Sequence, residues 1–199
     1  MLGKATTSRR FLRQFAHTLG ANAIFVAFVL AARQVTQRGG DEALEEWRSA
    51  AACTRGRFRP DGYGCYRRAA ARFGFFLEFD RGTERPAEHA AKLASYYRYR
   101  DSGAYARDYA SFPTLLVVTT TEVAEARFAL QLHLAQQRYG GTPLRAFLTT
   151  TDRIQDHPES VLGPIWRGPA PVQPVDRLAR VYWLPGRLWP AAATASARH

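Results

Sequence analysis

Two acidic side chains interrupt an apolar run that is typical of a buried strand, and a third opens the alternating segment that precedes it. Residues 74–84 read GFFLEFDRGTE, an apolar run that contains Glu78 and Asp80, while Asp61 opens the alternating segment PDGYGCYRR at 60–68. Side chains two positions apart on a strand point to the same face of a sheet. If the two segments pair as neighbouring strands, the three carboxylates converge at one end of the sheet.

Such a cluster has a definite chemistry. Neighbouring carboxylates raise one another's pKa unless a cation lies among them, and hard oxygen ligands suit Mg²⁺ or Mn²⁺. A bound ion would orient a water molecule and stabilise a phosphoryl transition state. We therefore predict Asp61, Glu78 and Asp80 as candidate metal ligands. Glu78 stands out because its apolar neighbours indicate burial, where a carboxylate needs a metal, an arginine or a backbone donor.

Each candidate also has a simpler interpretation. Asp61 follows a proline, a common position for a turn residue, and Asp80 with Arg81 could begin a plain turn at the end of a strand. Lys92, the candidate catalytic cation, lies four residues after Glu88, so a surface ion pair explains it as well as catalysis does. Glu45 and Glu46 are more easily explained as solvent-exposed side chains than as metal ligands.

A second group of residues fits nucleic-acid binding. The segment SYYRYR at 95–100 mixes aromatic and guanidinium groups, which together can stack on bases and contact phosphates. We take Tyr96, Arg98 and Arg100, with Arg81 beside the acidic run, as candidate contacts. The alternative is that the tyrosines pack in the core with their hydroxyl groups at its rim.

Periodicity and turn residues predict one ordered series of elements to position these groups. Alternation, β-branched runs, helical spacing and Gly or Pro boundaries mark them. The predicted helices are 12–37, 85–100 and 122–139; the strands are 60–68, 71–80, 112–121 and 143–151; residues 43–50 are left open between a short strand and a helix end. This order predicts an α/β fold with a three-layer mixed sheet flanked by helices.

The charge distribution predicts an anionic partner. The 199 residues are 46% hydrophobic, enough for one core, and contain 28 Lys and Arg against 17 Asp and Glu. Residues 1–40 hold six basic residues and no acid, and residues 160–199 hold five and one. Cationic arms attract polyanions, DNA above all, or serve as solubilising tails.

We divide the chain into a basic arm at 1–16, a domain at 17–168 and a Pro/Arg/Trp-rich extension at 169–199.

The N-terminal region also resembles an export signal. SRRFLRQ at 8–14 is similar to a twin-arginine motif, and AIFVAFVLAA at 23–32 could be its apolar region. That run is too short to span a bilayer and is bracketed by polar residues. We therefore predict a buried first helix, a cytoplasmic protein and no membrane partner.

Cys53 and Cys65 lack a disulfide or metal pattern and are expected to be free thiols.

Several ordered motifs carry a family resemblance. RPDGYGCY, FFLEFDRGTE, AAKLASYYRYR, FPTLLVVTT and LTTTDRI with GPIWR resemble the bacterial replication-relaxation family, which is associated with plasmid replication and DNA relaxation. The similarity covers roughly residues 17 to 168. The order of elements, with PD before one strand and an acidic pair on the next, also resembles the PD-(D/E)xK nuclease-type fold. That resemblance implies a restriction-endonuclease-like αβββαβ core.

The resemblance implies a DNA-associated protein that binds DNA, or a replication or mobilisation protein, in plasmid or mobile-element replication. The alternative is a nuclease or nickase dependent on Mg²⁺ or Mn²⁺, with Lys92 helping to stabilise charge. Where the nuclease pattern has its lysine this chain has Asp80, so ExK reads ExD, and we place binding before cutting. Family members usually carry a winged helix-turn-helix ahead of this region, and at most 16 residues precede His17 here.

Overall fold

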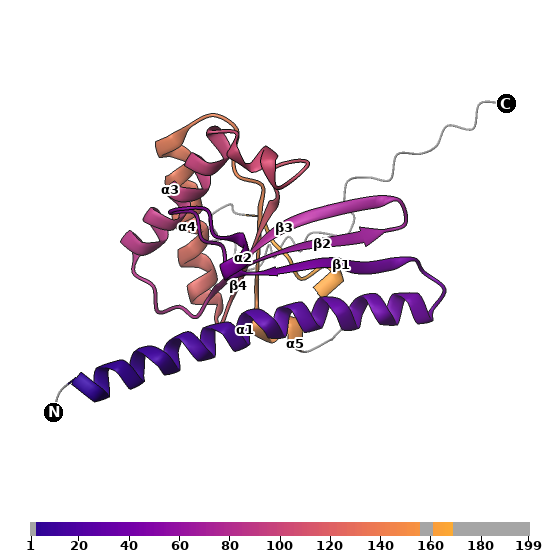
Figure 1. The fold of residues 1–199 in the computed structure, drawn as a ribbon, viewed down its shortest axis with the longest axis horizontal. Helices are drawn as coiled ribbons and strands as arrows, with labels where there is room; N and C mark the ends of the chain where they lie inside the picture. The colour runs from indigo at the N-terminus through magenta and orange to yellow at the C-terminus, as the bar shows by residue number, and fades with distance from the viewer. Residues whose placement is uncertain (1–2, 156–160, 169–199) are drawn as a thin grey trace, which may run out of the picture.

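The computed structural model describes residues 3–155 and 161–168 of the chain (Figure 1). The predicted C-terminal extension at 169–199 lies outside these residues. Helices and strands alternate along the described chain. The helical elements are α1 (Gly3–Gln37), α2 (Ala50–Cys53), α3 (Pro86–Asp101), η1 (Ala104–Arg107), α4 (Glu122–Tyr139) and α5 (Thr151–Gln155), and the strands are β1 (Glu42–Ser49), β2 (Gly62–Arg68), β3 (Ala71–Asp80), β4 (Thr114–Thr119) and β5 (Ala146–Thr150).

The five strands form one open mixed sheet whose spatial order, β1-β2-β3-β4-β5, is also the order along the chain. β1, β2 and β3 are an antiparallel meander, and β4 and β5 join in parallel to β3 and β4. Because Gly62 pairs with Leu77, the start of β2 lies at the end of β3 where β4 and β5 also end. We call this end of the sheet the carboxyl edge.

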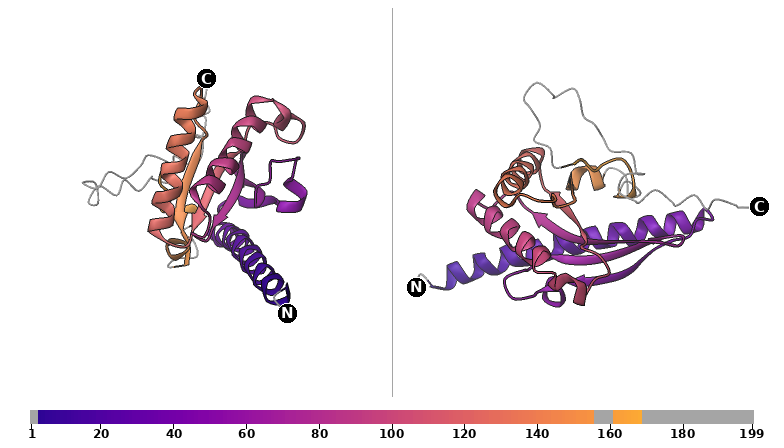
Figure 2. Two further views of the ribbon diagram at one scale, coloured as in Figure 1. Left: turned by 90° about the vertical axis from the view of Figure 1, so that its left-hand side faces the viewer. Right: turned by 90° about the horizontal axis from the view of Figure 1, so that it is seen from above.

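Helices cover both faces of the sheet, as predicted. The inner side of α1 packs with Phe75 and Leu77 of β3 on one face, and residues 161–166 join the same core. α3 and α4 pack with Phe76 and the apolar residues of β4 and β5 on the other face. Figures 1 and 2 show α1 on the opposite side of the strands from α3 and α4. β3 is therefore buried on both faces, which explains its nearly continuous apolar run.

The first helix begins at Gly3, earlier than the predicted start near residue 12, so residues 3–16 belong to α1. Its inner side carries Ala21, Ile24 and Phe28, all buried. In the part of the chain that the structure describes, one helical stretch, Gln14–Gln37, is long and apolar enough to cross a membrane on length and composition alone, and 28% of its apolar window is buried.

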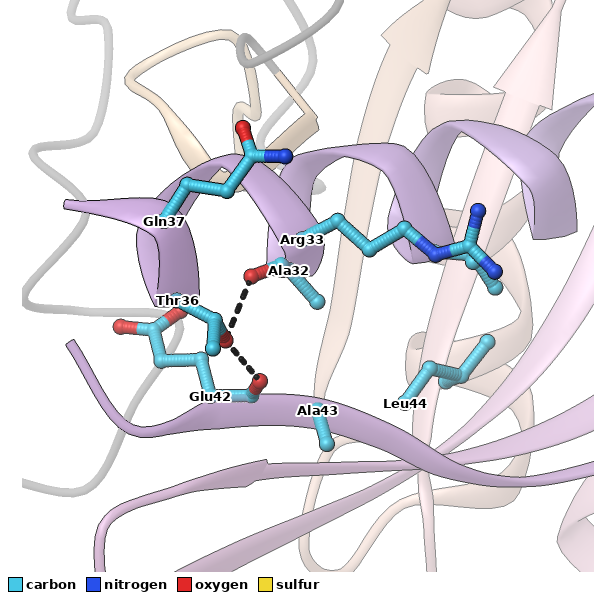
Figure 3. Close-up of a pocket in the computed structure, with 8 residues that line it drawn as sticks. Ala32, Arg33, Thr36, Gln37, Glu42, Ala43 and Leu44 are labelled. Atoms are coloured by element: carbon cyan, nitrogen blue, oxygen red, sulfur yellow. Dashed lines mark hydrogen bonds between the residues drawn. The ribbon is translucent and has the colours of Figure 1, made fainter. Parts of the chain in front are cut away.

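The undecided segment at 43–50 is a strand, β1, with an irregular register between Leu44 and Glu46. The end of α1 is tied to this strand by Thr36, whose hydroxyl oxygen lies 3.0 Å from the Ala32 carbonyl oxygen and 3.1 Å from that of Glu42 (Figure 3). A shallow pocket of about 360 Å³ lies beside this contact. It is lined by Val29, Ala32, Arg33, Thr36, Gln37, Glu42, Ala43 and Leu44.

Candidate functional site

The three predicted carboxylates all lie at the carboxyl edge, and each faces a different basic side chain from a helix. Two of the partners come from α3, which covers one face of the sheet, and one comes from α1, which covers the other. The pairs are Asp61 with His17, Glu78 with Lys92, and Asp80 with His89. The Glu78–Lys92 contact is an ion pair, and the two histidine contacts become ion pairs when the imidazole is protonated.

Glu78 is fully buried on β3, as its apolar neighbours predicted. Its Oε2 atom lies 2.7 Å from Lys92 Nζ, and the Tyr96 hydroxyl donates a 2.6 Å hydrogen bond to Oε1. Lys92 and Tyr96 are four residues apart on α3, so both project from the same side of the helix. Burial raises the pKa of the Glu78 carboxyl, and the Lys92 charge opposes that shift.

Lys92 lies among carboxylates from three parts of the chain. Its Nζ atom is 3.1 Å from Glu84 Oε1 in addition to the Glu78 contact, and Asp61 acts on it electrostatically. Burial lowers the pKa of Lys92, but the three negative charges outweigh burial and raise that pKa above its ordinary value. The alternative pairing with Glu88 is not what the structure shows, because the Glu88 carboxylate accepts the Arg85 backbone N–H at 2.6 Å.

Asp61 extends the pairing of β2 with β3 by one residue and meets α1. Its backbone N–H donates to the Leu77 carbonyl at 3.0 Å, and its Oδ2 accepts the Phe79 N–H at 2.8 Å. Oδ1 lies 2.9 Å from His17 Nε2. Burial raises the pKa of Asp61, but the His17 bond and the Lys92 charge lower it overall, and the same bond raises the pKa of His17.

His17 is a site residue that the sequence reasoning missed. The sequence placed it only as a polar residue bracketing an apolar helix, and neither its type nor its spacing indicated a partner. Its contact with Asp61 depends on where α1 crosses the sheet. A close approach sets that position, since a Cβ added at Gly20 would lie 2.0 Å from the Phe79 ring.

The Asp80 carboxylate contacts His89 and the backbone of the turn that follows β3. Its Oδ1 accepts the Gly82 N–H at 2.8 Å, and its Oδ2 lies 3.1 Å from His89 Nε2, which is also 3.4 Å from Glu84 Oε2. Burial raises the pKa of Asp80, but the bonds from His89 and Gly82 outweigh burial and lower it. Gly82 has a φ of 71°, which suits the turn that was the alternative interpretation of Asp80.

The structure thus brings Asp61, Glu78 and Lys92 together and pairs Asp80 with His89. Within residues 3–155 and 161–168, no group of three or more His, Cys, Asp or Glu side chains is arranged to hold a metal ion. The Mg²⁺ or Mn²⁺ ligands therefore stay a prediction. Cys53 and Cys65 are free thiols.

The predicted nucleic-acid contacts divide into buried and accessible residues. Tyr96 is fully buried, so its ring lies in the core and its hydroxyl contacts Glu78. Arg98 is exposed on α3 and Arg81 is half-buried at the carboxyl edge. Arg100 is paired with Asp101 at 2.8 Å. Of the predicted set, Arg81 and Arg98 are the side chains that can most readily meet a phosphate.

Two further exposed arginines, at positions 59 and 85, lie close in sequence to Asp61 and Asp80. Glu45, in contrast, forms ion pairs with Arg67 and Arg72 on the meander, and Glu46 pairs with Arg48. These two glutamates lie on β1 and are not partners of the carboxylates at the carboxyl edge.

A protein-family model described as replication-relaxation matches residues 3–115, more than half of the 199 residues. The matched stretch contains α1, the meander, α3 and the first residues of β4. It therefore includes both members of each of the three pairs at the carboxyl edge. Neither the curated proteins nor the solved structures that were compared with the chain gave a match.

Proposed function

Because the chain belongs to the replication-relaxation family, a membership that suggests a role in replication or in mobile-element processes, we propose that it acts there by binding DNA at the carboxyl edge. A partner protein that processes DNA is the other form of this proposal. The observation that carries it is that Asp61, Glu78 and Asp80 each contact a basic side chain supplied by a helix.

This pairing determines the electrostatic character of the edge. A carboxylate that contacts a basic side chain presents less free negative charge to an approaching polyanion than an unpaired one does. Three arginines lie close in sequence to these acids: Arg59 and Arg85 are exposed, and Arg81 is half-buried. Guanidinium groups suit phosphate oxygens because they bind them in a bidentate manner. The formal net charge of +11 adds long-range attraction.

A retardation assay with duplex DNA over a salt series tests the proposal. We expect affinity to fall as salt rises, and the double substitution Arg59→Gln/Arg85→Gln to lower it by about tenfold and to flatten the salt dependence. The matched control is Arg107→Gln/Arg138→Gln, which removes two exposed arginines that are remote in sequence from the carboxyl edge. Affinity that is insensitive to salt, or an equal loss in the control, would contradict DNA binding at this edge.

A metal-dependent nuclease is the second candidate, and one observation favours it. Lys92 Nζ lies 2.7 Å from Glu78 Oε2, so α3 supplies beside Glu78 the positive charge that position 80 lacks. Asp61 and Glu78 offer carboxylate oxygens, the donors that Mg²⁺ and Mn²⁺ prefer. An ion held by them would activate a water molecule and stabilise charge on a phosphate. Lys92 would then stabilise negative charge beside them.

Nicking of supercoiled plasmid in Mg²⁺ or Mn²⁺ separates the two candidates. Our preference for binding predicts no metal-dependent nicking by the wild-type protein. Nicking that is lost in Glu78→Gln but kept in Asp101→Asn, an exposed acid at the far end of α3, would establish the nuclease instead. Circular dichroism of both variants shows whether a loss of nicking reflects a loss of fold.

A further inference from the structure

The outer side of α1 is an apolar strip that no other described part of the chain covers. Six large apolar side chains on this helix have exposed fractions between 43% and 66%. They are Phe11, Leu12, Phe15, Leu19, Val26 and Leu30. The rings of Phe11 and Phe15 stack on each other with their centroids 6.3 Å apart. Apolar surface of this extent on one helix is typical of an interaction site.

The helical period explains the strip. At 3.6 residues per turn the six positions fall within roughly 100° of the helix circumference. The buried residues Ala21, Ile24 and Phe28 lie on the opposite side, against the sheet. The N-terminal part of α1 extends past the other elements, so the strip continues beyond the domain (Figures 1 and 2).

Charge identifies the kind of partner. Residues 14–32 contain no Lys, Arg, Asp or Glu, while positions 4, 9, 10 and 13 before them and positions 33 and 38 after them are basic. Residues 1–40 contain no acid. The strip is therefore uncharged with basic groups at both ends. A second copy of this chain is a poor partner, because pairing in either direction brings two wholly basic segments together.

We propose that this strip docks on an anionic lipid surface. Phe and Leu side chains enter the boundary between headgroups and acyl chains, and Lys and Arg meet anionic headgroups. The helix would lie on the membrane without crossing it. Its inner side is held in the core, and the 2.0 Å approach of a Cβ at Gly20 to the Phe79 ring shows how closely helix and sheet fit.

Co-sedimentation of the full chain with vesicles tests this inference. We expect binding to vesicles that contain phosphatidylglycerol, weaker binding at high salt, and little binding to phosphatidylcholine alone. Phe11→Ser/Phe15→Ser should lower the partition coefficient by at least about tenfold, since both rings leave the membrane. Both rings are exposed in the structure, so the double variant should fold. The control is Val123→Ser, which alters a 67% exposed residue on α4 and should bind like wild type.

Three results would overturn the inference. The first is equal binding to neutral and anionic vesicles, or none to either. The second is a dimer in light scattering that Phe11→Ser/Phe15→Ser converts to monomers, because a second copy would then cover the strip. The third is membrane association that survives an alkaline carbonate wash, which would mean that the helix inserts into the bilayer.

Discussion

Glu78 and Lys92 illustrate how costly a buried charge is and how the chain offsets that cost. Removing two ions from water is unfavourable, and their attraction compensates only when the geometry is close and the remaining atoms are bonded. Here the pair is 2.7 Å apart, Tyr96 donates to the second oxygen of Glu78, and Glu84 contacts the ammonium. Removing one member alone should therefore be far more harmful than neutralising both.

We expect Lys92→Met to lower the free energy of unfolding by about 3–5 kcal/mol, because it leaves the Glu78 carboxylate buried without its cation. Adding Glu78→Gln, which keeps a group able to accept the Tyr96 hydrogen bond, should restore part of that loss. Urea unfolding of the two single variants and the double variant measures the coupling. Arg98→Met, an exposed change on the same helix, should stay within about 0.5 kcal/mol of wild type. Additive effects at positions 78 and 92 would contradict a coupled pair.

The His17–Asp61 pair predicts a dependence on pH. The hydrogen bond with Asp61 raises the pKa of His17 above 6.5 in the folded protein. The stability that the pair contributes is therefore fully present below pH 6.5 and is lost as the pH rises through the raised pKa. NMR titration of the His17 ring should show the raised value, and Asp61→Asn should lower it. The ring signals of His133 on α4 serve as the internal control, and an unchanged His17 titration in Asp61→Asn would refute the pairing.

At the scale of elements, α3 supplies the basic partners of the two β3 acids, Glu78 and Asp80. His89, Lys92 and Tyr96 are spaced by three and four residues, so they lie on one side of the helix. Along β3, Glu78 and Asp80 lie two residues apart and point to the same face of the sheet. One face of α3 therefore contacts both acids of β3. These contacts explain how β3 can bury Glu78 and Asp80 two residues apart.

The contact of α1 with β3 depends on the absence of a side chain at Gly20. We expect Gly20→Ala to lower the free energy of unfolding by about 1–3 kcal/mol, despite the better helix propensity of alanine, because its methyl group overlaps the buried Phe79 ring. Thermal or urea unfolding measures the loss. Phe79→Leu made in the same chain should recover part of it. A Gly20→Ala variant at least as stable as wild type would show that the helix shifts freely on the sheet.

At the scale of the whole molecule, the order of helices and strands was predictable because each element has its own local sequence pattern. Alternation and β-branched runs identified β2 to β5, and the Gly140-Gly141 boundary fixed the end of α4, whose predicted bounds of 122–139 match the structure. The meander and the layers followed from connection rules. β1 stayed undecided because its acidic residues face arginines of β2 and β3 across the sheet, a pairing that its own eight residues do not reveal.

The partners of the site were less predictable, because each depends on packing between distant elements. Glu78 as a buried acid followed from its neighbours, but the sequence left Lys92 open between a site role and a surface pair with Glu88. His17 and His89 carried no signal of a carboxylate partner. The exposed strip on α1 was also hidden, since an apolar helix in sequence looks equally suited to full burial. The expectation of no membrane partner rested on full burial of this helix, whereas the exposed strip suits an anionic lipid surface.

A sheet whose spatial order equals its chain order has a consequence for synthesis on the ribosome. Each strand pairs with the strand translated just before it, so the sheet can grow from β1 toward β5 without waiting for distant segments. Glu78 is translated with β3, before Lys92 and Tyr96 of α3 exist. A nascent chain that ends after β3 therefore holds this acid near the His17–Asp61 pair but without Lys92. The Glu78 carboxylate gains its lysine partner only when α3 has left the exit tunnel and docked.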